Sequence, residues 1–187
     1  ATKIPVAVKY LTAQGAAIIN LSLATSGDVA VFDTTYAEHT DTLFVVAAGN
    51  GVAGGGRNIS HYPVFPARHS RKSKHVITVG AHDLSGQLAS FSNFSHEYVD
   101  LLAPGCAVPA RATAGKLVRD TGTSPATAVV SFAAGLVRSL GLNRSDRIKV
   151  RILASVDFDP TLSKQTRVSG RLNIVKAISL YHDTVET

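Results

Sequence analysis

Two continuous apolar runs separated by a helical segment constrain the fold of this chain most strongly. Residues 16–20 (Ala-Ala-Ile-Ile-Asn) and 43–48 (Leu-Phe-Val-Val-Ala-Ala) do not alternate with polar residues, which is typical of strands buried on both faces. Between them, a cap signal at Thr25–Asp28 predicts a helix that reaches about Glu38. A strand, a helix and a strand in this order predict a parallel pair joined by a right-handed crossover.

The remaining apolar segments extend this unit into a layered α/β fold. Further strands are expected at residues 76–80 and 98–103, with turns around a short strand at 83–94. A short helix is expected at residues 4–14, with Val6, Tyr10 and Leu11 on one face, and outer helices are expected at residues 146–156 and 172–181. The sequence therefore predicts a three-layer, mostly parallel sheet covered by helices on both faces.

Length and composition allow one sizeable core and exclude several classes of protein. The chain has 187 residues, 45% of them hydrophobic, so one domain portion spanning residues 1–187 is expected. The net charge of +6 comes from scattered side chains, so we expect no nucleic-acid partner. No apolar run is long enough for a membrane span, so no membrane partner is expected. Cys106 is the single cysteine, which excludes an internal disulfide framework and favours a small packed residue over a reactive thiol.

A basic run occupies residues 68–75, inside the irregular region that follows the second predicted strand. Such a run is most often a solvated loop. The other interpretations are a proteolytic processing site and a contact with an anionic partner.

A polar turn at residues 120–124 passes directly into a long apolar helix pattern that continues to Val137 and beyond. Gly122 permits backbone conformations that other residues avoid, Ser124 has the character of an N-cap, and Pro125 suits the first helical position. The hydroxyl of Ser124 is thereby expected at the positive end of a helix dipole. Two interpretations follow from the residues alone: a helix cap or a nucleophile.

Polar residues follow the first two predicted strands at the edge where parallel sheets bind their ligands. Asn20-Leu-Ser22 follows the first strand, and Gly49-Asn50 follows the second. The amide of Asn50 can donate two hydrogen bonds. An amide donor and a serine hydroxyl at one point suggest acyl transfer with a stabilised oxyanion, whereas the plainer interpretation is that Asn50 caps a turn.

Seven short segments, taken in their order, closely resemble the subtilisin-like serine proteases. The resemblance covers about residues 4 to 180, and its segments are 18–23 (Ile-Ile-Asn-Leu-Ser-Leu), 45–50 (Val-Val-Ala-Ala-Gly-Asn), 76–81 (Val-Ile-Thr-Val-Gly-Ala), 89–93 (Ala-Ser-Phe-Ser-Asn), 99–105 (Val-Asp-Leu-Leu-Ala-Pro-Gly), 122–127 (Gly-Thr-Ser-Pro-Ala-Thr) and 170–173 (Gly-Arg-Leu-Asn).

The resemblance implies a serine endopeptidase that hydrolyses peptide or protein substrates. In it, Ser124 matches the nucleophile and Asn50 matches the oxyanion-hole asparagine. The resemblance also implies that Ser22, Leu23 and Ala24 pair with extended substrate, and that Ala47, Ala48 and Gly49 form the opposite wall of the specificity pocket. The turn at Phe65–Pro66 resembles one that is often cis in the family.

The chain departs from the family in two ways. The family's catalytic aspartate and histidine precede the region that this chain matches, so we expect them from an N-terminal segment outside these residues, with the chain alone inactive. His61 and His69 are the candidates for a substitute base. Beside the nucleophile, Ala128 and Val129 replace the family's usual proline and histidine, which favours the alternative of an inactive pseudoprotease or peptide-binding module.

Cofactor and compartment are less constrained. Many relatives bind calcium, but the acidic residues are too scattered to specify a site, so no cofactor is expected. Secretion follows only from the resemblance, and the residues themselves indicate no compartment.

Overall fold

The chain forms a sheet between two layers of helices, which confirms the predicted three-layer α/β fold. The computed structural model describes residues 3–27, 30–52 and 55–179. The helices are α1 (Lys3–Ala13), α2 (Ala30–Glu38), α3 (Thr123–Ser139), α4 (Ser145–Ala154) and α5 (Ile174–Ser179), with short 3-10 turns η2 (Ala67–Arg71), η3 (Thr113–Gly115) and η4 (Pro160–Leu162). The strands are β1 (Ile18–Leu21), β2 (Leu43–Ala47), β3 (Val76–His82), β4 (Leu101–Pro104), β5 (Val108–Arg111), β6 (Leu117–Asp120), β7 (Asp157–Phe158) and β8 (Gly170–Arg171).

The main sheet has the strand order β1-β2-β3-β4-β8-β7. Its pairs are parallel from β1 to β8, and only β7 runs antiparallel to its neighbour within the part of the chain that is described. Ile18 lies opposite Leu43 in the pairing of β1 with β2, so the predicted parallel pair is confirmed. A separate antiparallel hairpin, β5–β6, precedes α3.

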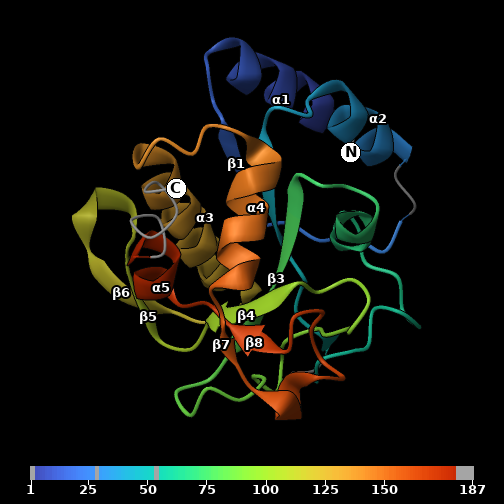
Figure 1. Ribbon diagram of the computed structural model, residues 1–187. Coiled ribbons are helices and arrows are strands. Elements are labelled where there is room, and N and C mark those ends of the chain that lie inside the picture. Colours follow the sequence, from blue (N-terminus) through green and yellow to red (C-terminus); the bar gives the residue numbers. More distant parts are fainter. Residues whose placement is uncertain (1–2, 28–29, 53–54, 180–187) are drawn as a thin grey trace.

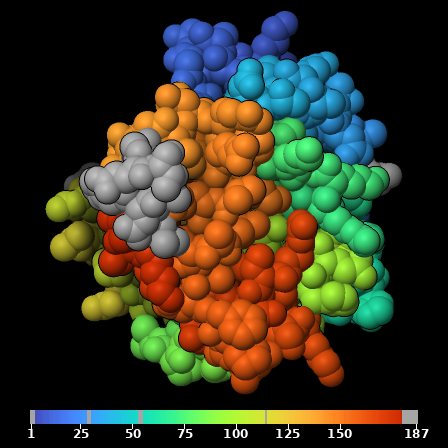
Figure 2. Space-filling model, in the orientation of Figure 1, coloured from blue at the N-terminus to red at the C-terminus, as the bar shows by residue number. Residues whose placement is uncertain are grey.

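Strand β2 shows why its sequence is apolar throughout. Leu43 and Val45 pack into the cluster under α3 and α4. Phe44 and Val46 point to the other face, into a cluster with Val8 and with the aromatic rings of α2. In Figure 1, α3, α4 and α5 gather on one side of the sheet, and α1 and α2 lie together at the top of the view. Figure 2 shows the first of these faces, where α4 and the chain after it form the middle of the surface.

The first helix packs against the core with a different face from the one that carries Val6 and Tyr10. Val6 is 70% exposed and Tyr10 is 65% exposed, whereas Val8 is 1% exposed and packs with Ile4 against the core. Both pairs have the four-residue spacing of one helical face, so periodicity could not choose between them. The choice follows from the docking of α1 against α2.

The basic run at 68–75 is only partly a solvated loop. Arg71, Lys72 and Lys74 are exposed, but His69 and His75 are buried. His69 Nδ1 lies 2.6 Å from Asp33 Oδ1, and its ring packs against that of Phe65. Aromatic neighbours from α2 and the preceding loop thus bury imidazole rings that a charge pattern assigns to solvent.

Other boundaries shift by a few residues. The strand predicted at 98–103 begins at Leu101, and the short strand expected within 83–94 is replaced by isolated bridges such as His82 with Leu88. The hairpin β5–β6 and the short strands β7 and β8 were not predicted. The peptide bond Phe65–Pro66 is cis, as the resemblance implies. Asp28, in the predicted cap of α2, and residues 180–181 of the last predicted helix lie outside the described residues.

A buried ionic cluster joins α4 to the sheet. The ammonium of Lys149 donates to the backbone oxygens of Ser70, Ser73 and Val76 and lies 3.7 Å from Asp100 Oδ2. Asp100 is fully buried and also accepts from Thr78 N at 2.8 Å. Burial lowers the pKa of Lys149, and Asp100 opposes that effect. The ammonium thus ties α4 to the segment that leads into β3 and to the first residue of that strand.

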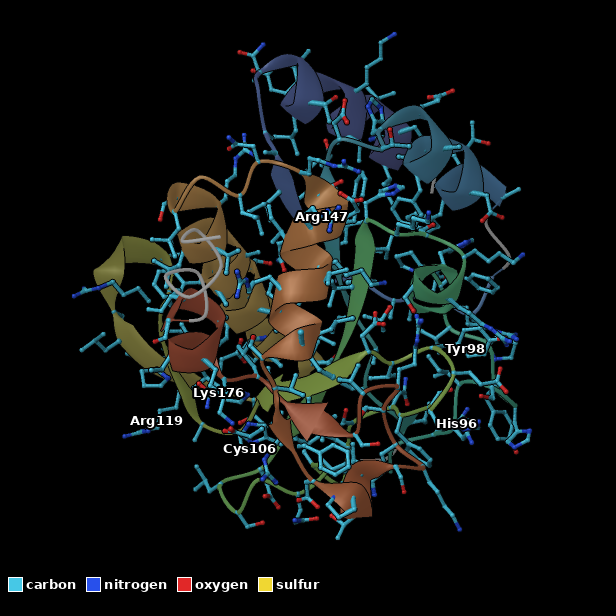
Figure 3. The ribbon with its side chains drawn as sticks, in the orientation of Figure 1. His96, Tyr98, Cys106, Arg119, Arg147 and Lys176 are labelled. Atoms are coloured by element: carbon cyan, nitrogen blue, oxygen red, sulfur yellow. The ribbon has the colours of Figure 1, made fainter. Side chains whose placement is uncertain are left out.

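We expect Lys149→Met to lower the free energy of unfolding by about 3 kcal/mol, because it leaves a buried carboxylate and several buried carbonyls with fewer donors. Urea unfolding followed by circular dichroism measures the change. The matched control is Lys176→Met on α5 (Figure 3), whose partner Asp157 lies 2.7 Å away in an exposed pair. Removal of that exposed pair should cost at most about 1 kcal/mol. Equal losses in both variants would contradict the assigned role of Lys149.

Candidate functional site

The candidate site lies where the carboxyl ends of β1 and β2 meet the start of α3. Because the two strands are parallel, with Leu21 opposite Val46, the residues that follow each strand emerge at the same edge of the sheet. The hairpin β5–β6 leads the chain back to this edge, and Gly122 N donates to Gly105 O at 2.9 Å just before α3 begins. Segments far apart in the sequence therefore converge here.

Asn50 is tied to the first turn of α3 through its side-chain oxygen. Asn50 Oδ1 accepts hydrogen bonds from Thr123 N and from Thr123 Oγ1, both at 3.0 Å. A backbone amide can only donate, so the oxygen of the Asn50 side chain must face Thr123. The Nδ2 group consequently points elsewhere and makes no hydrogen bond with any described residue. Asn50 thus ties the segment after β2 to the first turn of α3 and keeps a free donor beside that turn.

Ser124 does not occupy the N-cap position that its sequence context suggests. Helix α3 begins at Thr123, and its N-cap residue is Gly122, which has no side chain that could form a capping hydrogen bond. Asn50 Oδ1 accepts from the amide of Thr123, so a side chain from a distant segment satisfies the first amide of the helix. Ser124 therefore lies half-buried in the first turn, and its hydroxyl forms no hydrogen bond within the described chain.

Gly122 leaves the room that this arrangement needs. Its φ of 155° lies in a region that side chains rarely adopt. A Cβ at this position would lie 3.2 Å from Asn50 Nδ2. The predicted need for glycine at this turn is thus accounted for by both its backbone and its neighbour.

Ser22 connects the end of β1 to the same helical turn. Ser22 Oγ donates to Ser124 O at 3.2 Å and accepts from Asn20 Nδ2 at 2.9 Å. Asn20 Oδ1 in turn accepts from Ser131 Oγ at 3.2 Å, about two turns beyond Ser124 along α3. These bonds fix the segment after β1 alongside the turn that carries Ser124.

A cavity of about 380 Å³ opens beside Asn50. Ala24 lines it from the segment after β1, and Asn93 and Val64 line it from two later loops. Gly49 packs directly behind this lining: a Cβ there would lie 3.0 Å from Asn93 Nδ2 and 3.1 Å from Ala24 Cβ, and its φ is +85°. Any side chain at residue 49 would therefore push into the lining of the cavity.

The other residues predicted to bind substrate lie behind the cavity or beside it. Ala47 and Ala48 are buried in the core, and Leu23 packs partly buried against the cluster under α1 and α2. Arg57 and Tyr62 line the cavity and were not identified from the sequence. No local motif marks them, because they lie in the irregular region between β2 and β3 and reach the site only through tertiary folding.

On another side of Ser124 lies a mostly apolar hollow of about 410 Å³. Ser124, Ala128, Val129 and Phe132 of α3 line it together with the hairpin residues around Pro109. Phe132 is 61% exposed. The helix thus presents apolar side chains next to the serine, on the face where Ala128 and Val129 depart from the family pattern.

Neither histidine proposed as a substitute base contacts Ser124. His69 faces Asp33, and the backbone amide of His61 donates to Asn58 O in an exposed turn.

Burial, followed by the charge of Asp83, raises the pKa of the Cys106 thiol (Figure 3), which fits a packed residue. Among residues 3–27, 30–52 and 55–179, no three His, Cys, Asp or Glu side chains gather closely enough to hold a metal ion. The helices in these ranges are also too short or too polar to cross a bilayer.

Comparisons with known proteins place this chain in a family. The model of the subtilase family matches residues 2–157. A thermophilic serine proteinase of Bacillus sp. (strain AK1) is 32% identical over 176 residues, which are 92% of this chain and 40% of that protein. Thermitase of Thermoactinomyces vulgaris is 29% identical over 174 residues, covering 91% of this chain and 57% of its own length. The chain thus spans less than two thirds of the length of these relatives.

Solved structures show the same fold. The prenylagaramide maturation protease PagA superposes with a TM-score of 0.80 at 28% identity, over 100% of this chain and 68% of that one. A structure of the subtilase cytotoxin SubAB gives a TM-score of 0.80 at 24% identity, over 96% of this chain and 64% of that one. The second likeness concerns the fold alone.

Proposed function

The chain belongs to the subtilase family of serine proteases, and from that premise we propose that it forms the nucleophile and oxyanion-hole portion of a serine endopeptidase. The family membership confirms the resemblance drawn from the ordered motifs. The observation that carries the proposal is the anchoring of Asn50 by Thr123, which leaves an amide donor free beside the half-buried hydroxyl of Ser124.

In the proposed reaction, Ser124 Oγ attacks the carbonyl carbon of the scissile peptide bond and gives its proton to a histidine. The carbonyl oxygen becomes an oxyanion, which Asn50 Nδ2 and Ser124 N stabilise by hydrogen bonds. The tetrahedral intermediate then expels the amine, which takes the proton from the histidine, and leaves an acyl-serine. Water, deprotonated by the same histidine, hydrolyses this ester and restores the Ser124 hydroxyl.

Substrate would bind in extended form between the segment 22–24 and the end of β2. Its main chain would add a strand to these edges, and a side chain would enter the cavity lined by Ala24 and Asn50. The hydrogen bond from Ser22 to Ser124 O supports this geometry, because it holds one of the two edges at the nucleophile. Peptides or proteins are therefore the proposed substrates.

The histidine and its aspartate would come from an N-terminal segment outside residues 1–187, with these residues forming one portion of a single catalytic domain. The apolar hollow lined by Ser124 and Phe132 is the surface that such a segment would cover. A base has to lie within hydrogen-bond reach of the serine oxygen, and Ser124 itself lines this hollow.

A peptide-binding module without turnover is the second candidate function. Ala128 and Val129, which line the hollow beside Ser124, replace residues that the family usually has there. A segment that carries the catalytic histidine would therefore contact a surface that differs from the family's usual one. In this candidate the chain still binds peptides at the substrate edges and the cavity, but it does not hydrolyse them.

Labelling by a fluorophosphonate separates the two candidates. In the complete protein that contains this chain, an active site should attach the phosphonate to Ser124 with loss of fluoride, located by mass spectrometry of the modified peptide. Labelling that fails with the full catalytic domain present would exclude the peptidase and leave the binding module.

Filling the cavity should weaken peptide binding under either candidate. We expect Ala24→Phe to raise KM, or the dissociation constant of an uncut peptide, about tenfold, because the new ring occupies space that a substrate side chain needs. Fluorescence anisotropy with a labelled peptide measures the effect. Ala112→Phe, at an exposed position that does not line the cavity, is the control. Unchanged affinity in Ala24→Phe would show that peptides do not use this cavity.

A further inference from the structure

The cavity beside Asn50 carries a single charged side chain in its lining. Of the described residues around it, Arg57 is the cation, and no carboxylate lines the space. The rest of the lining is neutral, with Val52, Tyr62 and Val64 as its larger side chains. The cavity therefore combines apolar walls with one positive charge.

Arg57 lacks the acidic partner that several other arginines have. Arg71 pairs with Glu97, Arg144 with Asp146, Arg167 with Asp100 and Arg171 with Asp159. Within residues 3–27, 30–52 and 55–179, the guanidinium of Arg57 forms no ion pair. Its charge is thus available to a ligand.

The position of Arg57 is fixed by two contacts at the cavity. Its backbone amide donates to Asn93 Oδ1 at 3.0 Å, while Asn93 Nδ2 donates to Ala48 O at 3.0 Å at the end of β2. Its guanidinium carbon lies 5.6 Å from the centre of the Tyr62 ring. The aromatic face restricts an otherwise flexible side chain without neutralising it.

The location of the cavity decides which substrate residue would enter it. Asn50 lines the cavity and also presents the free amide donor. A peptide carbonyl held at that donor belongs to the residue on the amino side of the bond to be cut. The side chain of that same residue is the one nearest the cavity.

We propose that this cavity receives an acidic side chain, glutamate or aspartate, from the residue on the amino side of the cleaved bond, and that Arg57 determines this specificity. The proposal rests on the proposed function for the register of the peptide. A carboxylate replaces the water around the guanidinium with charge-assisted hydrogen bonds. An apolar side chain would displace that water without replacing its hydrogen bonds to the guanidinium. A basic side chain would be repelled by the positive charge.

Binding of uncut peptides tests the proposal without requiring catalysis. The protein carries Ser124→Ala, and the probes are fluorescein-labelled tetrapeptide amides that share three residues and end in glutamate, glutamine or lysine. Anisotropy titrations should give about fivefold tighter binding of the glutamate peptide than of its glutamine isostere, the size expected of a solvent-exposed ion pair. The preference should shrink as salt is added.

Variants of Arg57 identify the source of the preference. Arg57→Gln should abolish the difference between the glutamate and glutamine peptides, and Arg57→Glu should favour the lysine peptide. A folding defect cannot reverse a preference in this way. Arg147→Gln, at an exposed position of α4 (Figure 3), is the matched control and should keep the preference for glutamate.

Equal binding of the glutamate and glutamine peptides, a preference that survives Arg57→Gln, or the absence of binding by every peptide would each overturn the proposal. None of these outcomes bears on the nucleophile, because fluorophosphonate labelling of Ser124 requires no side chain in the cavity. Conversely, a protein that prefers glutamate peptides but resists labelling would retain the specificity site and lose the proposed peptidase activity.

Discussion

Ser124→Ala will abolish peptide hydrolysis and fluorophosphonate labelling in the complete protein. Removal of the hydroxyl leaves no atom to form the acyl intermediate, so kcat should fall by roughly a millionfold, the loss known for subtilisin, a member of the same family. The hydroxyl forms no hydrogen bond within the described chain, so its removal should leave the unfolding midpoint close to that of the parent protein. The measurements are single-turnover kinetics with a fluorogenic peptide and urea unfolding of the same preparations.

Ser139→Ala provides the matched control for that result. Ser139 is an exposed serine at the last residue of α3, far along the helix from its first turn. Its replacement should leave labelling and hydrolysis unchanged. Hydrolysis that persists in Ser124→Ala would mean that another nucleophile acts, and loss of hydrolysis in both variants would point to a damaged helix instead.

The fold was predictable from the sequence where burial on both faces left little choice. The apolar run at 43–48 has to be an interior strand, because it has no polar face to present to water, and β2 indeed contacts both core clusters. Helix α1 was harder, because Ile4 with Val8 and Val6 with Tyr10 share the same spacing. Its orientation depends on docking against α2, which local periodicity does not contain.

The candidate site was predictable to the extent that it follows strand ends and a helix start. Parallel pairing of β1 with β2 brings the segments after them to one edge, so the convergence of Ser22 with Asn50 follows from topology. The turn of Ser124 reaches the same edge through the hairpin β5–β6, which was not predicted. The actual cap of α3 could not be predicted, because the acceptor comes from residue 50 rather than from residue 124. Arg57 was missed for a related reason: its contact with the Tyr62 ring has no signature in the sequence.

Asn50→Asp will separate the stabilisation of the oxyanion from the anchoring of the helix. One carboxylate oxygen can still accept from Thr123 N and Thr123 Oγ1, so the tie between the end of β2 and α3 is kept. A negative charge near the start of α3 also interacts favourably with the helix dipole. We therefore expect no loss in the free energy of unfolding. The second oxygen, however, replaces the free Nδ2 donor with an acceptor that repels the oxyanion.

The expected consequence is a fall in kcat of at least about a hundredfold to a thousandfold, the range known for the oxyanion-hole asparagine of subtilisin, with KM nearly unchanged. Steady-state kinetics of the complete protein measure both constants. Thr123→Val is the complementary control, because it weakens the anchoring of Asn50 and leaves the oxyanion donor in place. It removes one of the two hydrogen bonds to Asn50 Oδ1 but keeps the Nδ2 donor, so kcat should fall far less than in Asn50→Asp. If Asn50→Asp instead raised KM with kcat preserved, the side chain would be binding the ground state of the substrate. A loss of stability that matched the loss of activity would make Asn50 a structural cap only.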